Sequence, residues 1–158
     1  MIAKAAGVLV MGAAFALVSL TGAGRPPGPG MTLAASSAPA PAGSLGVAGI
    51  GAVASAAGFA GPSLAMAIAV ALAESSGDPT ATDQDSNGTV DRGLWQINSV
   101  HRAYSPACDY DPACAARAAY AISQSGTDWS PCVTYDHGTE IAYLPAAIAW
   151  VAARSATP

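Results

Sequence analysis

The chain has 158 residues, a length that favours one folded domain. Hydrophobic residues make up 52% of it, with alanine the most frequent, whereas 10% are charged and 6% are aromatic, which excludes a charge-rich disordered chain and a charged coiled coil. The formal net charge is −4 and no cluster of Lys or Arg stands in the sequence, which argues against nucleic-acid binding.

The N-terminal segment 1–23 is typical of a targeting element. Lys4 supplies a short basic start, and residues 5–23 then run without a charge. This pattern predicts a secretory signal peptide or an uncleaved signal anchor, with a buried N-terminal helix as a third alternative. We therefore expect export to the cell envelope or the extracellular space, with membrane anchoring where the segment is retained.

Residues 24–45 are predicted to form a flexible Pro/Ala/Gly linker. Five of the twelve prolines of the chain lie in this stretch, among Gly, Ser and Ala. Proline keeps the backbone extended and removes hydrogen-bond donors, so the stretch is unlike a folded element. The remaining residues, 46–158, are long enough for one compact domain with a core of its own.

Two apolar helices are expected at the start of this domain. Gly46–Phe59 consists of small apolar residues with several glycines, which predicts a closely packed helix. Pro62 then breaks the chain, Ser63 can cap the next helix, and Leu64–Glu74 is apolar on all sides, as in a central buried helix. A membrane hairpin over 46–73 is the competing interpretation, weakened by the shortness of each run and by the proline between them.

The second half of the domain alternates loops with helices. Asp111 and Pro112 suit the cap and the first turn of a third helix, and Pro145 allows the last helix to begin only near Leu144. The predicted elements are a turn-rich loop with a small hairpin over 78–92, a helix over 112–123, a loop over 127–139 and a helix over 144–154. The expected fold class is mainly α with one polar loop region.

Glu74 is the strongest catalytic candidate. It closes the apolar helix, and Val70 and Ala71, one turn earlier, offer it no polar partner. Burial and the negative end of the helix macrodipole both disfavour a charged carboxylate, so we expect a raised pKa and a protonated group suited to general-acid catalysis. The alternative is an exposed terminal glutamate paired with Arg92 or Arg102.

Two motifs around this glutamate resemble a known family. Glu74 begins the sequence ESSGDP, and GLWQIN follows at residues 93–98. With the Ala-rich DPACAARAAYAI helix and the TYDHG loop, they resemble lytic transglycosylases of the soluble lytic transglycosylase (SLT) type, which have a lysozyme-like helical fold. The resemblance covers about residues 47–150. Two departures stand in the last loop, where Cys132 and Asp136 occupy positions that many relatives fill with Trp and with a small residue.

The resemblance implies cleavage of the β-1,4 bond between N-acetylmuramic acid and N-acetylglucosamine in peptidoglycan. Glu74 would protonate the glycosidic oxygen and then, as a base, help the muramoyl 6-hydroxyl attack C1, giving 1,6-anhydro-muramoyl ends. A lysozyme-type muramidase that hydrolyses the same bond with Asp91 or Asp136 as a second carboxylate is the main alternative. A non-catalytic cell-wall-binding or assembly protein with the same fold is the alternative from another class. No cofactor is expected.

Six further residues form the predicted substrate-binding set: Ser75, Gly93, Trp95, Gln96, Asn98 and Tyr135. The amide of Gln96 suits sugar hydroxyls or N-acetyl groups, and Gly93 permits close approach of the glycan. Trp95 either lines the cleft or fills the core. Ser75 and Tyr135 are expected to hydrogen-bond the catalytic carboxyl group, and Tyr135 alternatively an N-acetyl group.

The cysteines and an acidic loop provide competing signals. Cys108 and Cys114 are close enough in sequence for a local disulfide after export, with Cys114–Cys132 as the competing pair. No metal site is expected from these cysteines, although a Cys–His nucleophile is a minor alternative. The run DQDSNG at 83–88 resembles the first half of a calcium loop, but an ordinary Asx-turn loop is the favoured interpretation because the twelfth position is Leu94.

Overall fold

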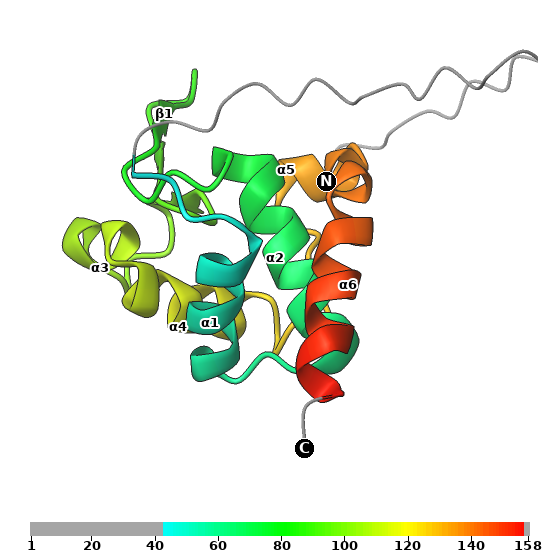
Figure 1. Cartoon of the computed structure of the whole chain (residues 1–158). Coiled ribbons are helices and arrows are strands. Elements are labelled where there is room, and N and C mark those ends of the chain that lie inside the picture. The colour runs from blue at the N-terminus through cyan, green and yellow to red at the C-terminus, as the bar shows by residue number, and fades with distance from the viewer. Residues whose placement is uncertain (1–42, 157–158) are drawn as a thin grey trace, which may run out of the picture. The chain divides into compact units, whose positions relative to one another are not determined.

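The computed structural model describes residues 43–156, so the predicted signal or anchor segment 1–23 and most of the linker 24–45 lie outside the described residues. Within the described range the chain is mainly helical and carries a small three-stranded antiparallel sheet, as the sequence predicts (Figure 1). Leu45, at the end of the predicted linker, is already part of the folded domain, because its amide donates to the Gly77 carbonyl oxygen at 2.8 Å.

Helix α2 (Gly61–Ser75) lies at the centre of the fold, and helix α1 (Val47–Ala57) packs against it. α2 begins three residues before the predicted start because Pro62 is tolerated in a first helical turn. The Ser63 hydroxyl caps this end, accepting from the Ala60 amide and donating to its carbonyl oxygen. The predicted central buried helix is confirmed by its buried residues, which are Leu64, Ala65, Ala67, Ile68, Ala69, Val70 and Ala71.

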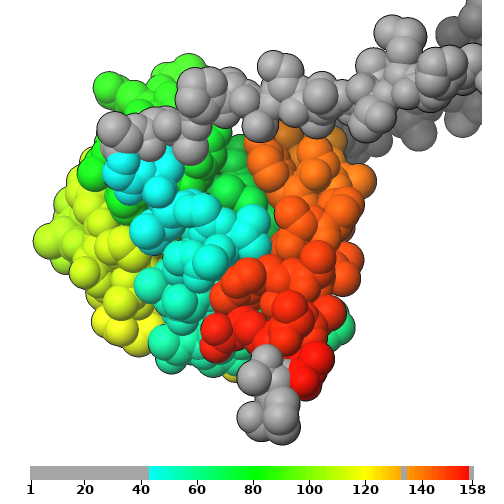
Figure 2. Space-filling view, viewed as in Figure 1, coloured from blue at the N-terminus to red at the C-terminus, as the bar shows by residue number. Residues whose placement is uncertain are grey.

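The glycines of α1 allow helix α6 (Leu144–Ser155) to approach closely. A Cβ atom added at Gly51 would lie 2.3 Å from a ring carbon of Trp150 in α6, so only glycine fits there. In Figure 2 the cyan surface of α1 lies directly beside the red surface of α6. The prediction of a closely packed first helix is therefore confirmed, as is the start of α6 at Leu144 with Pro145 in its first turn.

The polar loop region folds into strands β1 (Thr82–Gln84), β2 (Val90–Arg92) and β3 (Ile97–Asn98). The predicted hairpin is β1–β2, and β3 extends it to a sheet in the order β1-β2-β3. Its register sets Asp91 opposite Asp83 on one side and opposite Asn98 on the other. This register fixes which polar side chains lie together at the candidate site.

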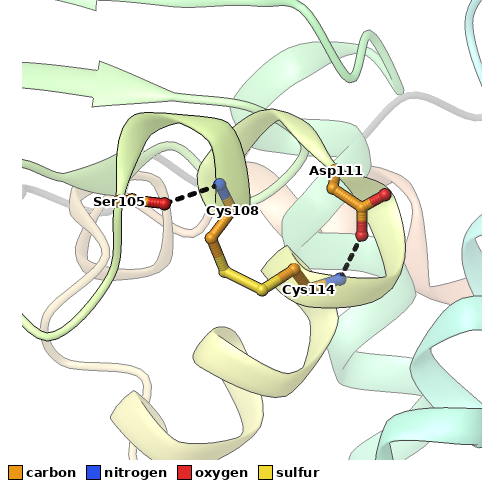
Figure 3. Close-up of a disulfide and its surroundings, with 4 residues drawn as sticks. All are labelled: Ser105, Cys108, Asp111 and Cys114. Atoms are coloured by element: carbon orange, nitrogen blue, oxygen red, sulfur yellow. Dashed lines mark hydrogen bonds between the residues drawn. A yellow bond between two sulfur atoms is a disulfide. The ribbon is translucent and has the colours of Figure 1, made fainter.

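Two capped helices carry the disulfide (Figure 3). α3 (Pro106–Tyr110), which the sequence analysis missed, and α4 (Pro112–Ile122) each have a proline in the first turn. The N-cap residues Ser105 and Asp111 accept hydrogen bonds from the amides of Cys108 and Cys114, at 3.3 and 2.7 Å. The Cys108–Cys114 disulfide is confirmed and Cys132 is a free thiol.

The predicted loop 127–139 contains a short helix, α5 (Val133–Asp136), and leads into a 3-10 turn, η1 (Thr139–Ala142). An aromatic cluster fastens this region to the core. The Phe59 ring stacks on Trp129 with centroids 5.9 Å apart and meets Tyr120 edge-on at 4.9 Å. The start of the loop is therefore held against the turn between α1 and α2, where Phe59 also contacts Tyr120 of α4.

The alternative of a membrane hairpin is not supported by the packing. α1 packs against α4 and α6, and α2 packs against α1 and α6. Among the residues that the structure describes, no helix has the length and apolar character needed to cross a membrane.

Substituting Gly51 tests the α1–α6 contact. Gly51→Ala is expected to lower the free energy of unfolding by about 1–3 kcal/mol, because the added methyl group overpacks against Trp150. Gly49→Ala in the same helix meets a Leu45 side chain at 3.1 Å and is the matched control, for which we expect little loss or a small gain. Urea unfolding measures both, and equal stabilities would contradict the contact.

Candidate active site

A cavity of about 150 Å³ opens between the end of α2, the sheet and the loop that follows α4. A single ordered water needs only about 10–15 Å³, so the cavity has room for part of a larger ligand. Its lining residues are Glu74, Asp85, Asp91, Trp95, Gln96, Ile97, Asn98, His101, Ala119, Ile122, Ser123, Asp128, Trp129, Pro131 and Cys132. Four of these described lining residues are carboxylic acids and none is Lys or Arg, so the cavity is acidic.

Glu74 lies in the last turn of α2, half-buried at the boundary between the core and the cavity. The helix stops one residue later because Ser76 (φ 53°) and Gly77 (φ 81°) take left-handed conformations. One of the two arginines considered as its ion-pair partner is engaged elsewhere, since Arg92 pairs with the buried Asp109 at 3.8 Å. The geometry thus presents the carboxyl group of the helix end to the cavity.

Two hydrogen bonds fasten α2 to the 93–98 segment. The Ser75 hydroxyl donates to the carbonyl oxygens of Leu94 and Ala71, at 3.0 and 2.9 Å, and accepts from the Gly77 amide. Trp95 is 3% exposed, and its indole N–H donates to the Ala67 carbonyl oxygen at 3.0 Å. Ser75 therefore positions the helix end through the backbone, and Trp95 both fills the core and lines the cavity.

Gln96 is held in a strained loop at the cavity wall. Its φ is 44°, which is uncommon for a residue other than glycine. The side-chain amide nitrogen compensates by donating to the carbonyl oxygens of Gly93 and Ala81, at 2.8 and 3.3 Å. The Gln96 donors thus shape the loop, and its carbonyl oxygen is the group with acceptor capacity for a ligand.

Gly93 lies close to the backbone of another part of the chain, at Asp109. A Cβ atom at this position would lie within 2 Å of the Asp109 carbonyl oxygen, and the φ of 71° also favours glycine. The sequence predicts that this glycine admits the glycan, whereas in the structure α3 packs against it. Burial raises the pKa of the Asp109 carboxyl group, and Arg92 and His101 partly offset that effect.

Asp85 and Asp91 bring two more carboxyl groups to the cavity from the hairpin. The Asp85 carboxylate accepts hydrogen bonds from the Thr89 hydroxyl at 2.5 Å and from the Asn98 side-chain amide at 3.0 Å. Burial raises the pKa of Asp91, hydrogen bonding from Asn98 lowers it, and the nearby Asp85 and Asp83 raise it again. Two acidic groups therefore share the cavity with the glutamate of α2.

The opposite wall comes from the loop after α4. Trp129 is 4% exposed and presents an apolar surface, while Asp128 is ionised more readily because hydrogen bonds from Ser130 lower its pKa. Burial raises the pKa of Cys132 to about 12. The negative charges of Glu74, Asp91 and Asp136 contribute to this rise. A thiol that ionises so reluctantly is a poor nucleophile, which argues against a catalytic Cys–His pair.

The structure brings together part of the predicted set. Glu74, Trp95, Gln96 and Asn98 all line the cavity, whereas Ser75, Gly93 and Tyr135 do not. Tyr135 lies on α5 and is 37% exposed. The lining residues that the sequence did not place at the site include His101, Asp128, Trp129, Pro131 and Cys132, and apart from the departure at Cys132 no local motif marked these five.

The acidic run at 83–88 forms turns. Asn87 Oδ1 accepts from the Thr89 amide and hydroxyl, at 2.8 and 2.7 Å, and Asp83 Oδ1 accepts from the Gln84 amide at 2.9 Å. Within residues 43–156, no group of three or more His, Cys, Asp or Glu side chains is arranged to hold a metal ion. These side chains stabilise the hairpin, which is the Asx-turn interpretation.

Comparison with models of protein families identifies the domain. Residues 51–134, more than half of the chain, match the profile of a family described as a lysozyme-like domain of the SLT type. The matched range includes Glu74, the sheet, the disulfide and the loop that contains Cys132. A comparison with curated proteins finds no match to this chain.

The free thiol gives a test of the cavity wall. Because the pKa of Cys132 is about 12, its thiolate fraction near pH 8 is far below that of an ordinary cysteine. Iodoacetamide should therefore alkylate the native protein at least about a hundredfold more slowly than the urea-unfolded protein, as mass spectrometry will measure. Cys132→Ser, which should take up no label, is the control, and equal native and unfolded rates would contradict the burial of this thiol.

Proposed function

This chain belongs to the SLT-type family of lysozyme-like domains, which are peptidoglycan-acting glycosidases, and from that premise we propose that it is a lytic transglycosylase. The observation that carries the proposal is the cavity that Glu74 shares with Gln96, which joins the ESSGDP and GLWQIN motifs in one site. Its substrate is the β-1,4 bond between N-acetylmuramic acid and N-acetylglucosamine. The segment 1–23 supports export of the enzyme to the cell wall.

In the proposed reaction Glu74 acts first as an acid and then as a base. Its proton goes to the glycosidic oxygen, the bond from that oxygen to C1 breaks, and positive charge develops on the muramoyl ring. The resulting carboxylate then accepts the proton of the 6-hydroxyl while that oxygen bonds to C1. The product is a 1,6-anhydro end, no water is consumed, and Glu74 recovers its proton.

Asp91 is proposed to stabilise the developing positive charge. Its carboxyl group lines the same cavity, and in its ionised form it supplies a fixed negative charge in partly desolvated surroundings. Gln96 and Asn98 complete this polar wall, and Trp129 supplies the apolar wall that keeps water away from the reacting groups.

Hydrolysis of the same bond is the second candidate, and the position of Asp91 favours it. Glycosidases that use water employ two carboxyl groups on the two sides of the scissile bond. Asp91 lines the cavity together with Glu74, whereas Asp136, the other proposed second acid, does not. Mass spectrometry of the products distinguishes the two courses, because anhydro ends are one water lighter than reducing ends.

Glu74→Gln tests the acid. The amide keeps the size of the side chain but cannot donate a carboxylic proton, so cleavage of purified peptidoglycan should fall at least about a hundredfold. Asp136→Asn, which changes an acid outside the cavity, should leave the rate within about twofold. Retained cleavage by the Glu74 variant would contradict both candidate reactions, and a wild-type protein that binds the strands without cutting them would indicate a wall-binding protein.

Asp91→Asn tests the second carboxyl group. If Asp91 stabilises positive charge on the sugar, the variant should cleave about a hundredfold more slowly and still give anhydro ends. Loss of reducing-end products alone, with anhydro products unchanged, would assign Asp91 to a hydrolytic reaction instead. Chromatography and mass spectrometry of the released muropeptides measure both product classes.

A further inference from the structure

Asn98 occupies a special position among the acidic groups of the hairpin. The β2–β3 register sets it directly opposite Asp91, while the β1–β2 register sets Asp83 on the other side of the same residue. Directly opposed residues of an antiparallel pair have Cβ atoms about 4.5–5.5 Å apart, so their side chains interact. Asp91 is therefore flanked by a carboxylate on one side and an amide on the other.

The hydrogen bonds of Asn98 are already committed within the hairpin. Its side-chain nitrogen donates to Asp85 Oδ2 and to Thr89 Oγ1, both at 3.0 Å, and its side-chain oxygen accepts from the Val100 amide at 2.9 Å. The orientation of the amide is fixed by these partners, because the oxygen faces a backbone N–H and the nitrogen faces the carboxylate. Asn98 thus presents its donor face to the acidic wall of the cavity.

The charges around Asp91 determine how much the Asn98 amide can affect it. Asp91 is partly buried, and one of its oxygens, Oδ1, has no hydrogen-bond partner among the described residues. Arg92, the adjacent cation, is directed to Asp109. The ionisable groups near Asp91 in the hairpin and across the cavity are Asp83, Asp85, Arg92, Glu74, His101, Asp128 and Cys132. Most of them are acidic, so they oppose a second negative charge at Asp91.

We propose that Asn98 is a positioning residue for the reaction: it lies directly opposite Asp91 in the sheet, and its side-chain amide holds the Asp85 carboxylate on the same cavity wall. The sequence suggested that Asn98 binds substrate, but its amide donors face the protein. By donating to Asp85 the amide offsets part of the negative charge that opposes ionisation of Asp91, and hydrogen bonding from Asn98 acts against the burial that raises the pKa of Asp91. The inference rests on the proposed function for its effect on cleavage, but its effect on Asp91 is independent of activity.

Carbon NMR titration of the Asp91 carboxyl group, identified by comparison with Asp91→Asn, tests the proposal in the whole protein. Asn98→Asp replaces the donor by a carboxylate of the same size, and Asn98→Ser withdraws the amide without adding charge. Both should raise the pKa of Asp91, the first by about one unit, which is a tenfold change in proton affinity. Asn87→Asp adds the same charge at an exposed hairpin position that does not line the cavity and is the matched control.

The rate of peptidoglycan cleavage should follow this titration. Asp91 must be ionised to stabilise positive charge, so a raised pKa moves the fall in rate on the acid side to higher pH by the same amount. A titration of Asp91 that is the same in Asn98→Asp, Asn98→Ser and Asn87→Asp would overturn the proposal. If Asp91 shifts as expected but the wild-type protein cleaves no glycan, the proposed function fails while the positioning role holds. Asn98→Ser decides the case if Asn98→Asp does not fold.

Discussion

The hydrogen bond from the Ser75 hydroxyl to the Leu94 carbonyl oxygen is the link on which the site depends. It joins the end of the central helix to a segment 19 residues further along the chain, at a donor–acceptor distance of 3.0 Å. The indole of Trp95 reinforces it by donating to the Ala67 carbonyl oxygen. The Trp95 donor is buried and the Ser75 donor is partly buried, so leaving either hydrogen bond unmade would be costly. Because the two segments cannot move apart, Glu74 and the hairpin face one another across the cavity.

The charge pattern of this cavity follows from the contact between α2 and the 93–98 segment. An apolar helix brings one carboxyl group to its end, and a tightly turned hairpin brings two more, Asp85 and Asp91. Like charges so close together favour proton uptake unless donors intervene. Asn98 is such a donor, while the nearest arginine is occupied by the buried Asp109. The negative charge of this wall is therefore moderated by neutral hydrogen-bond donors. Neutral donors leave the wall negative, which suits a site where positive charge develops transiently in the substrate.

Local rules predicted much of this structure. Proline in a first turn, a capping aspartate and an unbroken apolar run define α2, α4 and α6 from sequence neighbours alone. The missed features depend on distant contacts. α3 is five residues long and is stabilised by its cap and by the disulfide, and the reason for glycine at Gly93 is the backbone of α3. Likewise, no local pattern could place Trp129 and Cys132 on the cavity wall, because the packing of Trp129 against Phe59 fixes that loop.

Binding of a glycan in this cavity is the central claim, and chemical-shift mapping tests it most directly. A soluble tetramer of β-1,4-linked N-acetylglucosamine would be titrated into isotope-labelled Glu74→Gln protein, which should bind the sugar without cleaving it. The account predicts shifts concentrated at cavity residues such as Gln96, Asn98 and His101. Shifts confined to the far packing of Gly51 and Trp150, or none at saturating sugar, would contradict it.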